Sequence, residues 1–129
     1  MSTLRFPDVQ RVLVEILTTL AGGAGHVGTE TPRELKASLP FVRVRRLSGP
    51  SDTVNDYPTV DIDVFAALYS EAEPLAEEIR EFLTVRRAPS PLLDRIRCEA
   101  GPHELLWGDG TVRRILATYT VVTRRRTPA

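Results

Sequence analysis

Several chemically useful residue types are scarce in this chain of 129 residues. Cys98 is its only cysteine, so neither an internal disulfide nor a zinc site with four thiolates can form within one chain. His26 and His103 are its only histidines, and neither has a second metal-binding residue at ligand spacing. No apolar run approaches the ~18 residues of a membrane span, and the first residues lack a signal-peptide pattern. We therefore expect a soluble protein that needs no cofactor, with both histidines in solvent-exposed loops.

Net charge is also absent, because Lys+Arg and Asp+Glu number 17 each. A nucleic-acid-binding domain usually has a clear basic excess. The hydrophobic fraction of 42% is ordinary for a globular protein. Since a domain has about 150 residues, we expect residues 1–129 to form a single domain.

The first amphipathic segment runs from Asp8 to Ala21. Its apolar residues recur at helical spacing: Val9, Val12, Leu13, Ile16, Leu17 and Leu20. Gly22–Gly25 ends it, since glycine has too much backbone freedom to remain helical. This pattern predicts a helix.

A capping-box pattern at Ser70–Glu73 begins a second helix, which we expect to end near Leu83. Its expected buried stripe includes Leu75, Ile79, Phe82 and Leu83. Acids occupy the outer face: Glu71, Glu73, Glu77, Glu78 and Glu81.

Alternating or β-branched residues predict strands elsewhere. The expected strands are Phe41–Leu47, Thr59–Ala66, Arg95–Glu99, Val112–Arg124 and a further short one at Glu104–Trp107. Turn residues over 48–58 predict a long, mobile loop, and we expect residues 125–129 to fray. The order predicts an α+β fold: a mostly antiparallel sheet of four to five strands with two main helices on one face.

Asp61 and Asp63 form the most suggestive chemical pattern. Two acids at i and i+2 share one face of a strand and could hold a divalent cation, as in a metal-dependent nuclease. The alternative, which we favour, is a solvated strand face whose acids pair with Arg43 or Arg45 on the neighbouring strand. Cys98 alternates with charged residues, which predicts a thiol on the apolar face of its strand rather than a nucleophile.

Lys36 is the only lysine, so the positive charge is almost all arginine. Arginine suits interfaces because its guanidinium is weakly hydrated and forms bidentate pairs with carboxylates. An arginine-bearing strand face on one copy could therefore contact the acidic helix of the next, and such a head-to-tail contact closes into a ring if the rotation permits. The candidate interface residues are Arg43, Arg45, Arg46, Asp52, Asp56, Glu73, Glu77, Glu81, Arg113 and Arg114. The arginine clusters leave a nucleic-acid-binding module open as an alternative.

Short segments along nearly the whole chain resemble the tail terminator (tail completion) proteins of long-tailed bacteriophages. The resemblance is carried by the opening helix and by residues 27–32, 39–44, 57–66, 99–102 and 112–119. It implies an α+β subunit of a homo-oligomeric ring, expected to be a hexamer, that caps the head-proximal end of the tail tube.

That resemblance also implies partners and a location. The partners would be the tail tube protein and a head–tail connector or stopper protein, with genomic DNA passing through the ring without specific binding. The protein would assemble in the host cytoplasm and reside in the virion, with no catalytic, metal or membrane-binding role. A different head–tail neck protein, a stopper or adaptor, is the main alternative.

Overall fold

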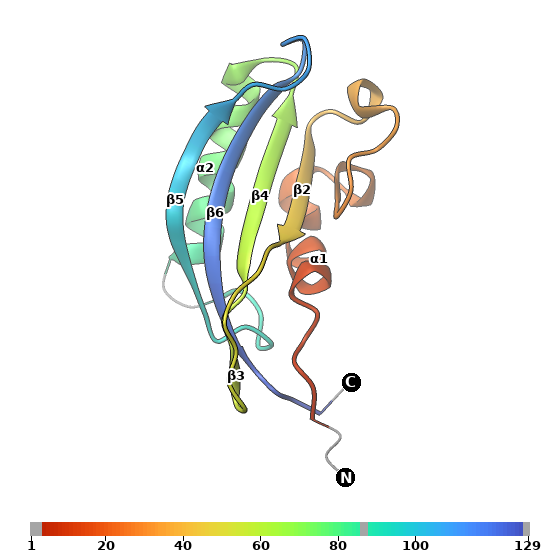
Figure 1. The fold of residues 1–129 in the computed structure, drawn as a ribbon. Coiled ribbons are helices and arrows are strands. Elements are labelled where there is room, and N and C mark those ends of the chain that lie inside the picture. The colour runs from red at the N-terminus through yellow and green to blue at the C-terminus, as the bar shows by residue number, and fades with distance from the viewer. Residues whose placement is uncertain (1–3, 86–87, 128–129) are drawn as a thin grey trace.

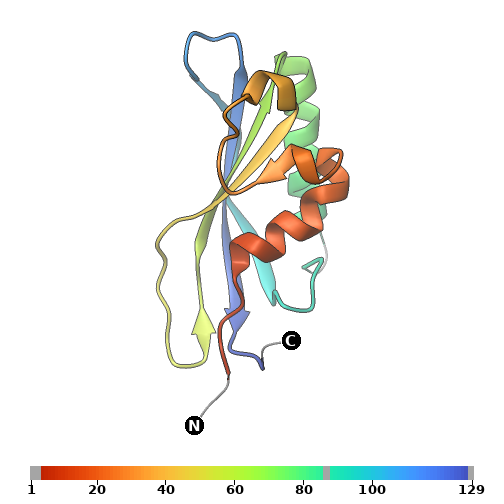
Figure 2. The same cartoon turned by 90° about the vertical axis from the view of Figure 1, so that its right-hand side faces the viewer.

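The computed structural model describes residues 4–85 and 88–127, in which a six-stranded mixed sheet carries two α-helices on one face (Figures 1 and 2). Its main elements are α1 (Val9–Ala21), β1 (Val27–Gly28), β2 (Phe41–Arg46), β3 (Asn55–Asp56), β4 (Thr59–Ala66), α2 (Tyr69–Thr84), β5 (Arg95–Leu105) and β6 (Arg113–Arg124). Short 3-10 turns lie at Ala24–His26 and Leu35–Ser38. The predicted α+β class is confirmed, with one strand more than expected. No helix of the described residues is long and apolar enough to cross a membrane.

The first helix begins and ends as its sequence predicts. The Asp8 carboxylate accepts the backbone N–H of Arg11 (3.2 Å) and caps the amino-terminal turn. Gly22 adopts φ +103°, a left-handed conformation that glycine reaches without strain, and the N–H of Gly23 donates to the carbonyl of Thr18. The apolar stripe, which includes Leu13 and Leu17, packs into the core under the sheet.

The second helix corrects two expectations. It begins at Tyr69, and no side chain caps it, so the predicted capping box at Ser70–Glu73 does not form. Ile79 and Leu83 are buried as predicted, but Phe82 is 39% exposed. At 3.6 residues per turn, Phe82 lies roughly 90° from the centre of the buried stripe, which small Ala72 and Ala76 complete.

Strand β4 is central, because it pairs antiparallel with both β2 and β6. On the far side of β6 lies β5, while two-residue β1 runs parallel to β2 at the other edge. The two strands expected at Arg95–Glu99 and Glu104–Trp107 form the single strand β5, interrupted by register shifts on either side of Ala100. Such bulges let one strand continue past Pro102, which has no N–H for the ladder.

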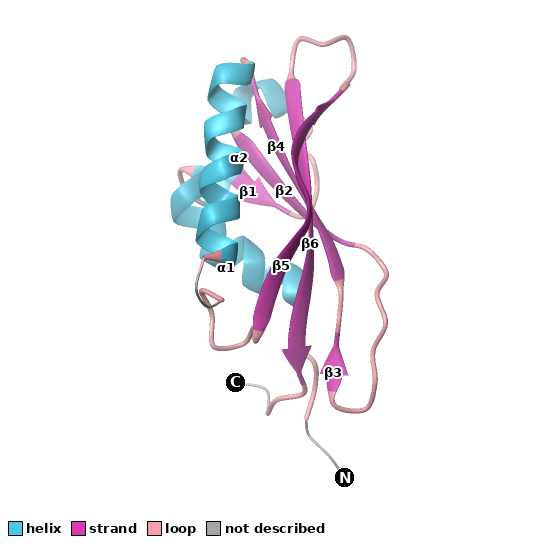
Figure 3. Cartoon of the chain, turned by 90° about the vertical axis from the view of Figure 1, so that its left-hand side faces the viewer, coloured by secondary structure: helices cyan, strands magenta, loops and turns pink. Residues whose placement is uncertain are grey.

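The segment expected as a loop extends the β2–β4 hairpin (Figure 3). Strand β3 continues the β4 register along β6. The residues that follow β2 run alongside β3 and form bonds such as Tyr57 N–H to the Pro50 carbonyl (3.0 Å). Gly49 makes this possible, since a Cβ there would lie 2.2 Å from the Tyr57 oxygen. We call residues 47–58 the arm; the mobility expected there stays a prediction.

The carboxyl-terminal segment also makes specific bonds. Arg126 and Arg5 exchange two backbone hydrogen bonds (2.7 and 2.8 Å), and the Arg126 guanidinium pairs with Asp94 (2.8 Å). The expected fraying of residues 125–129 stays a prediction, and residues 128–129 lie outside those that the structure describes.

The two faces of the sheet differ in cover. Both helices pack on one face, whose strand residues include Val44, Ile62 and Ile115. The alternate residues, such as Arg43 and Asp63, point to the opposite face, which neither α-helix covers. At one end of that face, Leu35 of the 3-10 turn packs against Phe41 and Phe65. The predicted placement of both main helices on one face is confirmed.

Candidate functional site

The two acids singled out from the sequence lie on the helix-free face of β4 but are not solvated. Asp63 is fully buried and Asp61 is 9% exposed. The register places Arg43 opposite Asp63 and Arg45 opposite Asp61, so the predicted cross-strand pairing is confirmed. The expectation of a solvated face is wrong, because the long arginine side chains lie over the carboxylates.

Asp63 is the centre of this charge cluster. Its Oδ2 accepts bonds from Nε and Nη2 of Arg43 (3.1 and 2.9 Å), and its Oδ1 accepts one from Nε of Arg114 (2.6 Å). A third cation, Arg45, places Nη2 3.5 Å from Oδ2. Paired and hydrogen-bonded in this way, a buried carboxylate can remain charged.

Asp61 completes the cluster on the same face. Its Oδ1 accepts the hydroxyl proton of Thr118 (2.7 Å), and its Oδ2 lies 3.6 Å from Nη2 of Arg45. Arg43 makes one further bond, from Nη1 to the hydroxyl of Thr31 (2.8 Å). Three guanidinium groups over two carboxylates leave the cluster with a formal charge of +1.

An aromatic pair covers one end of the cluster. The rings of Phe65 and Trp107 meet edge to face, with centroids 4.9 Å apart. The guanidinium of Arg43 lies 5.3 and 5.4 Å from the two centroids, and that of Arg114 lies 5.5 Å from Trp107. These contacts are cation–π interactions, which favour arginine over lysine.

This arrangement opposes the metal-site hypothesis on positive grounds. Three of the four carboxylate oxygens of Asp61 and Asp63 accept hydrogen bonds, and the fourth, Oδ2 of Asp61, lies 3.6 Å from Nη2 of Arg45. A cation would have to displace arginine from this site. Among the described residues, no group of three or more His, Cys, Asp or Glu could hold a metal ion.

Sequence reasoning missed Thr31, Trp107 and Thr118. Thr118 could have been found, because the strand alternation that pairs Asp61 also extends to β6. Thr31 and Trp107 reach the cluster from loops, and no periodic pattern specifies where a loop returns.

Of the other candidate interface residues, Arg46, Asp56 and Arg113 form ion pairs within the subunit. Asp56 is buried and accepts a bond from Arg46 (2.8 Å), and Arg113 donates two bonds to Glu104 (2.6 and 2.9 Å). The Arg113 guanidinium lowers the pKa of Glu104 below its usual range. The remaining candidates are Asp52, at the tip of the arm, and three acids of α2, Glu73, Glu77 and Glu81.

His26 corrects another expectation. It is half-buried, and its Nδ1 lies 2.7 Å from the Pro40 carbonyl oxygen and 2.9 Å from that of Ser38. His103 is exposed, as expected, but stands in strand β5.

Cys98 faces the core side of β5, as predicted. Burial raises the pKa of its thiol, and the positive charge of Arg80 only partly offsets this. The neighbouring Tyr119 is buried, which raises the pKa of its phenol. A thiol with a raised pKa is a poor nucleophile at neutral pH, in agreement with a structural role.

Comparisons with known proteins give the chain a family. The model of a family described as phage tail termination protein matches residues 5–94, which is most of the chain from before α1 to the loop preceding β5. No curated protein matches the sequence. Among solved structures, a chain from the virion of a native gene transfer agent particle shares the fold. The TM-score is 0.55 at 15% identity, over 95% of this chain and 89% of that one. The chain therefore belongs to the phage tail termination protein family, whose members are structural proteins of the phage tail.

Proposed function

We propose that this protein caps the head-proximal end of a phage tail tube as a ring of identical subunits. The ring stops polymerisation of the tube and then presents the surface to which the filled head joins. The family match over residues 5–94 carries this proposal. A hexameric ring is the expected form.

Separation of charge supports self-association. The acids of α2 lie on the helix side of the sheet, whereas Arg45 and the rest of the Asp63 cluster lie on the other. Opposite charges on opposite sides favour a head-to-tail contact, the kind that closes into a ring. Arg43 and Arg114 are engaged within the subunit. The intersubunit contacts therefore fall to more exposed candidates: Glu73 and Glu81 on the helix side, and Arg45, whose side chain is 37% exposed, on the other.

The proposed role is binding rather than catalysis. The carboxylates that a nuclease would use are occupied by arginine and threonine donors, which favours a structural role for them. DNA passes through the ring without specific contacts. The zero net charge accords with this proposal, since a DNA-binding domain usually has a basic excess.

The direct test adds the purified protein to tube protein that is polymerising. We expect negative-stain images to show tubes of limited length with a ring at one end. Native mass spectrometry should give the mass of the ring and so its number of subunits. Tubes that grow as long with the protein as without it would refute capping. Binding to a portal-side complex and not to tube ends would favour the stopper or adaptor alternative.

A separate measurement tests the passive role towards DNA. We expect no detectable duplex binding at 50 mM salt. Binding that weakens steeply with rising salt would instead support the nucleic-acid-binding alternative.

A further inference from the structure

We propose that the arm of one subunit docks on the outer face of helix α2 of the next subunit. This inference rests on the proposed ring and names the two surfaces that form it. The occupant of each surface is a second copy of this chain.

The arm extends away from the helices. It curls to the side of the sheet opposite α1 and α2, at the end where both termini lie (Figures 2 and 3). Two of its aliphatic side chains remain in solvent, with Val54 58% and Leu47 42% exposed. A protruding segment with uncovered apolar residues is typical of an interaction surface.

Internal bonds give the arm a defined shape before it meets a partner. The Asp52 carboxylate accepts the N–H groups of Val54 and Asn55 (2.8 and 2.7 Å) and holds the tip as a turn. Arg125 donates its Nε proton to the Thr53 carbonyl (2.9 Å), which anchors the tip to the end of β6. A preorganised arm loses little conformational entropy when it binds.

The end of β6 that lies beside the tip of the arm is positively charged. Arg124 and Arg126 share the single carboxylate of Asp94. The Arg125 guanidinium stacks 4.2 Å from the Phe6 ring, and no ion pair within the described residues involves it. A shallow hollow lies here, lined in part by Val54 and these arginines.

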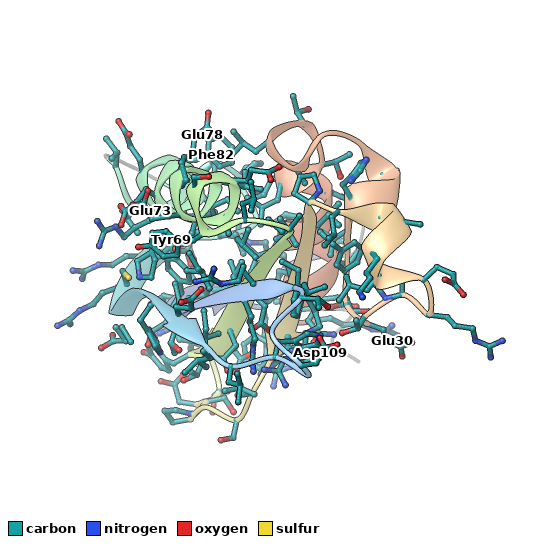
Figure 4. All side chains as sticks on the ribbon, turned by 90° about the horizontal axis from the view of Figure 1, so that it is seen from above. Glu30, Tyr69, Glu73, Glu78, Phe82 and Asp109 are labelled. Atoms are coloured by element: carbon teal, nitrogen blue, oxygen red, sulfur yellow. The ribbon has the colours of Figure 1, made fainter. Side chains whose placement is uncertain are left out.

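The outer face of α2 has the complementary character. Figure 4 shows Glu78 and Phe82 on the side of α2 that points away from the sheet. Glu77 pairs with Arg80, whereas none of the ion pairs within residues 4–85 and 88–127 involves Glu73, Glu78 or Glu81.

Apolar groups stand among these acids. Phe82 is 39% and Val85 is 50% exposed. Another shallow hollow follows the helix, lined in part by Pro74, Glu78, Glu81 and Val85. This face offers an apolar contact for Val54 and negative charge for Arg125, and aromatic anchors such as Phe82 are common at interfaces.

The geometry makes the contact heterologous. Since the arm and α2 lie on opposite sides of the sheet, one subunit can donate its arm to one neighbour and accept an arm from another. Repetition of this contact closes a ring when the rotation per subunit allows it.

Charge reversal tests the contact. We expect Glu78→Arg and, separately, Arg125→Glu each to raise the protein concentration needed for half-assembly by about tenfold or more, most strongly at low salt. The double variant should recover assembly. Glu30→Arg is the matched control, because Glu30 is an exposed acid away from α2 (Figure 4) and its reversal should leave assembly unchanged.

Arg125 also holds the arm tip, so a second arm variant is needed. Thr53→Glu adds negative charge at the tip without removing a side-chain bond, and it should weaken assembly as Arg125→Glu does. Far-ultraviolet circular dichroism and melting of each variant separate lost contact from lost fold. Folded single variants that assemble like the parent protein would overturn the proposal, as would a parent protein that never assembles.

Cross-linking gives a positive test. With Cys98→Ala, the pair Val54→Cys and Phe82→Cys should yield on oxidation a ladder of covalent oligomers that ends at the ring. A covalent species limited to dimers, or none at all, would contradict a head-to-tail contact through these residues.

Tube length distinguishes this inference from the proposed function. If the parent protein limits tube growth but Glu78→Arg and Arg125→Glu form equally good rings, only the arm contact is wrong. If the parent protein assembles through this contact but tubes grow without limit, the capping function is wrong and the contact stands.

Discussion

The two faces of the sheet bury their side chains by different means. On the helix face, Ile62 is covered by apolar neighbours under α1 and α2. On the opposite face, Asp63 is just as inaccessible, but its cover is the arginine side chains that neutralise it. Burial of Ile62 depends on packing volume, whereas burial of Asp63 depends on paired charge. Apolar cover returns on the second face at the Phe65 end, where Leu35 and Phe41 pack.

The comparison implies different costs when a residue is removed. A truncated apolar side chain leaves a cavity, which partial collapse can reduce. A deleted buried carboxylate leaves cations without their counter-charge, and collapse cannot restore it.

The largest effect is expected for Asp63→Ala. The substitution leaves Arg43 and Arg114, which are largely covered, without their shared acceptor, so we expect a loss of about 3–5 kcal/mol in unfolding free energy. Denaturant-induced unfolding followed by circular dichroism measures it. Asp61→Ala is the control and should cost less, because Asp61 is 9% exposed where Asp63 is fully buried, and it lies farther from its arginine. Equal losses for the two variants would mean that the cluster does not centre on Asp63.

The next largest loss of stability is expected for a substitution in the arm, which neither α-helix covers. In Gly49→Ala the new Cβ would lie 2.2 Å from a backbone oxygen of Tyr57, so the two branches of the arm must separate. We expect a loss of about 1–3 kcal/mol, as for overpacking in a tight site.

Hydrogen exchange should locate that effect. Faster exchange is expected at the Tyr57 amide, with the helices little changed. Gly25→Ala is the matched control, because a Cβ at Gly25 meets nothing within 4 Å. Unchanged hydrogen exchange along the arm in Gly49→Ala would show that the two branches of the arm pack less closely at Gly49 than they do in the structure.

These cases show which parts of the fold could be predicted from local pattern. Helix α1 followed from its spacing and its glycine end, and β4 followed from alternation, because one period dictates each of them. The arm could not be predicted, because its residues are typical of turns and only pairing with the distant β6 makes them strand-like.

The candidate site divides in the same way. The alternation of the strand predicted that Asp61 and Asp63 share one face and pair with arginines of the neighbouring strand. It could not predict that both carboxylates are buried. Burial arises when β6 contributes Arg114 and a loop contributes Trp107, both far along the chain. Phe82 is the opposite case: its apolar side chain lies near the buried stripe of α2 and was expected in the core, but it is exposed to solvent.

A small change on the helix face sharpens the comparison. Ile62→Val removes one methyl group from a core position and should cost about 1 kcal/mol. The measurement is the same denaturant unfolding as for Asp63→Ala, the adjacent position on the other face. A cost above that of Asp63→Ala would reverse our ranking of the two faces.

The smallest effect concerns acid and the tip of the arm. Two backbone N–H groups, from Asn55 and Val54, lower the pKa of Asp52 below its ordinary value. Because the folded pKa is the lower one, this carboxylate stabilises the turn fully above the unfolded value of about 3.9 and loses that effect as the pH falls through the folded pKa. Hydrogen exchange at the Val54 and Asn55 amides, corrected for the intrinsic rate, should therefore be constant from pH 7 to pH 5 and rise only in stronger acid. In Asp52→Asn the rise with acid should disappear, since that side chain does not titrate. A rise already complete at pH 5 would mean that a group other than Asp52 controls the tip.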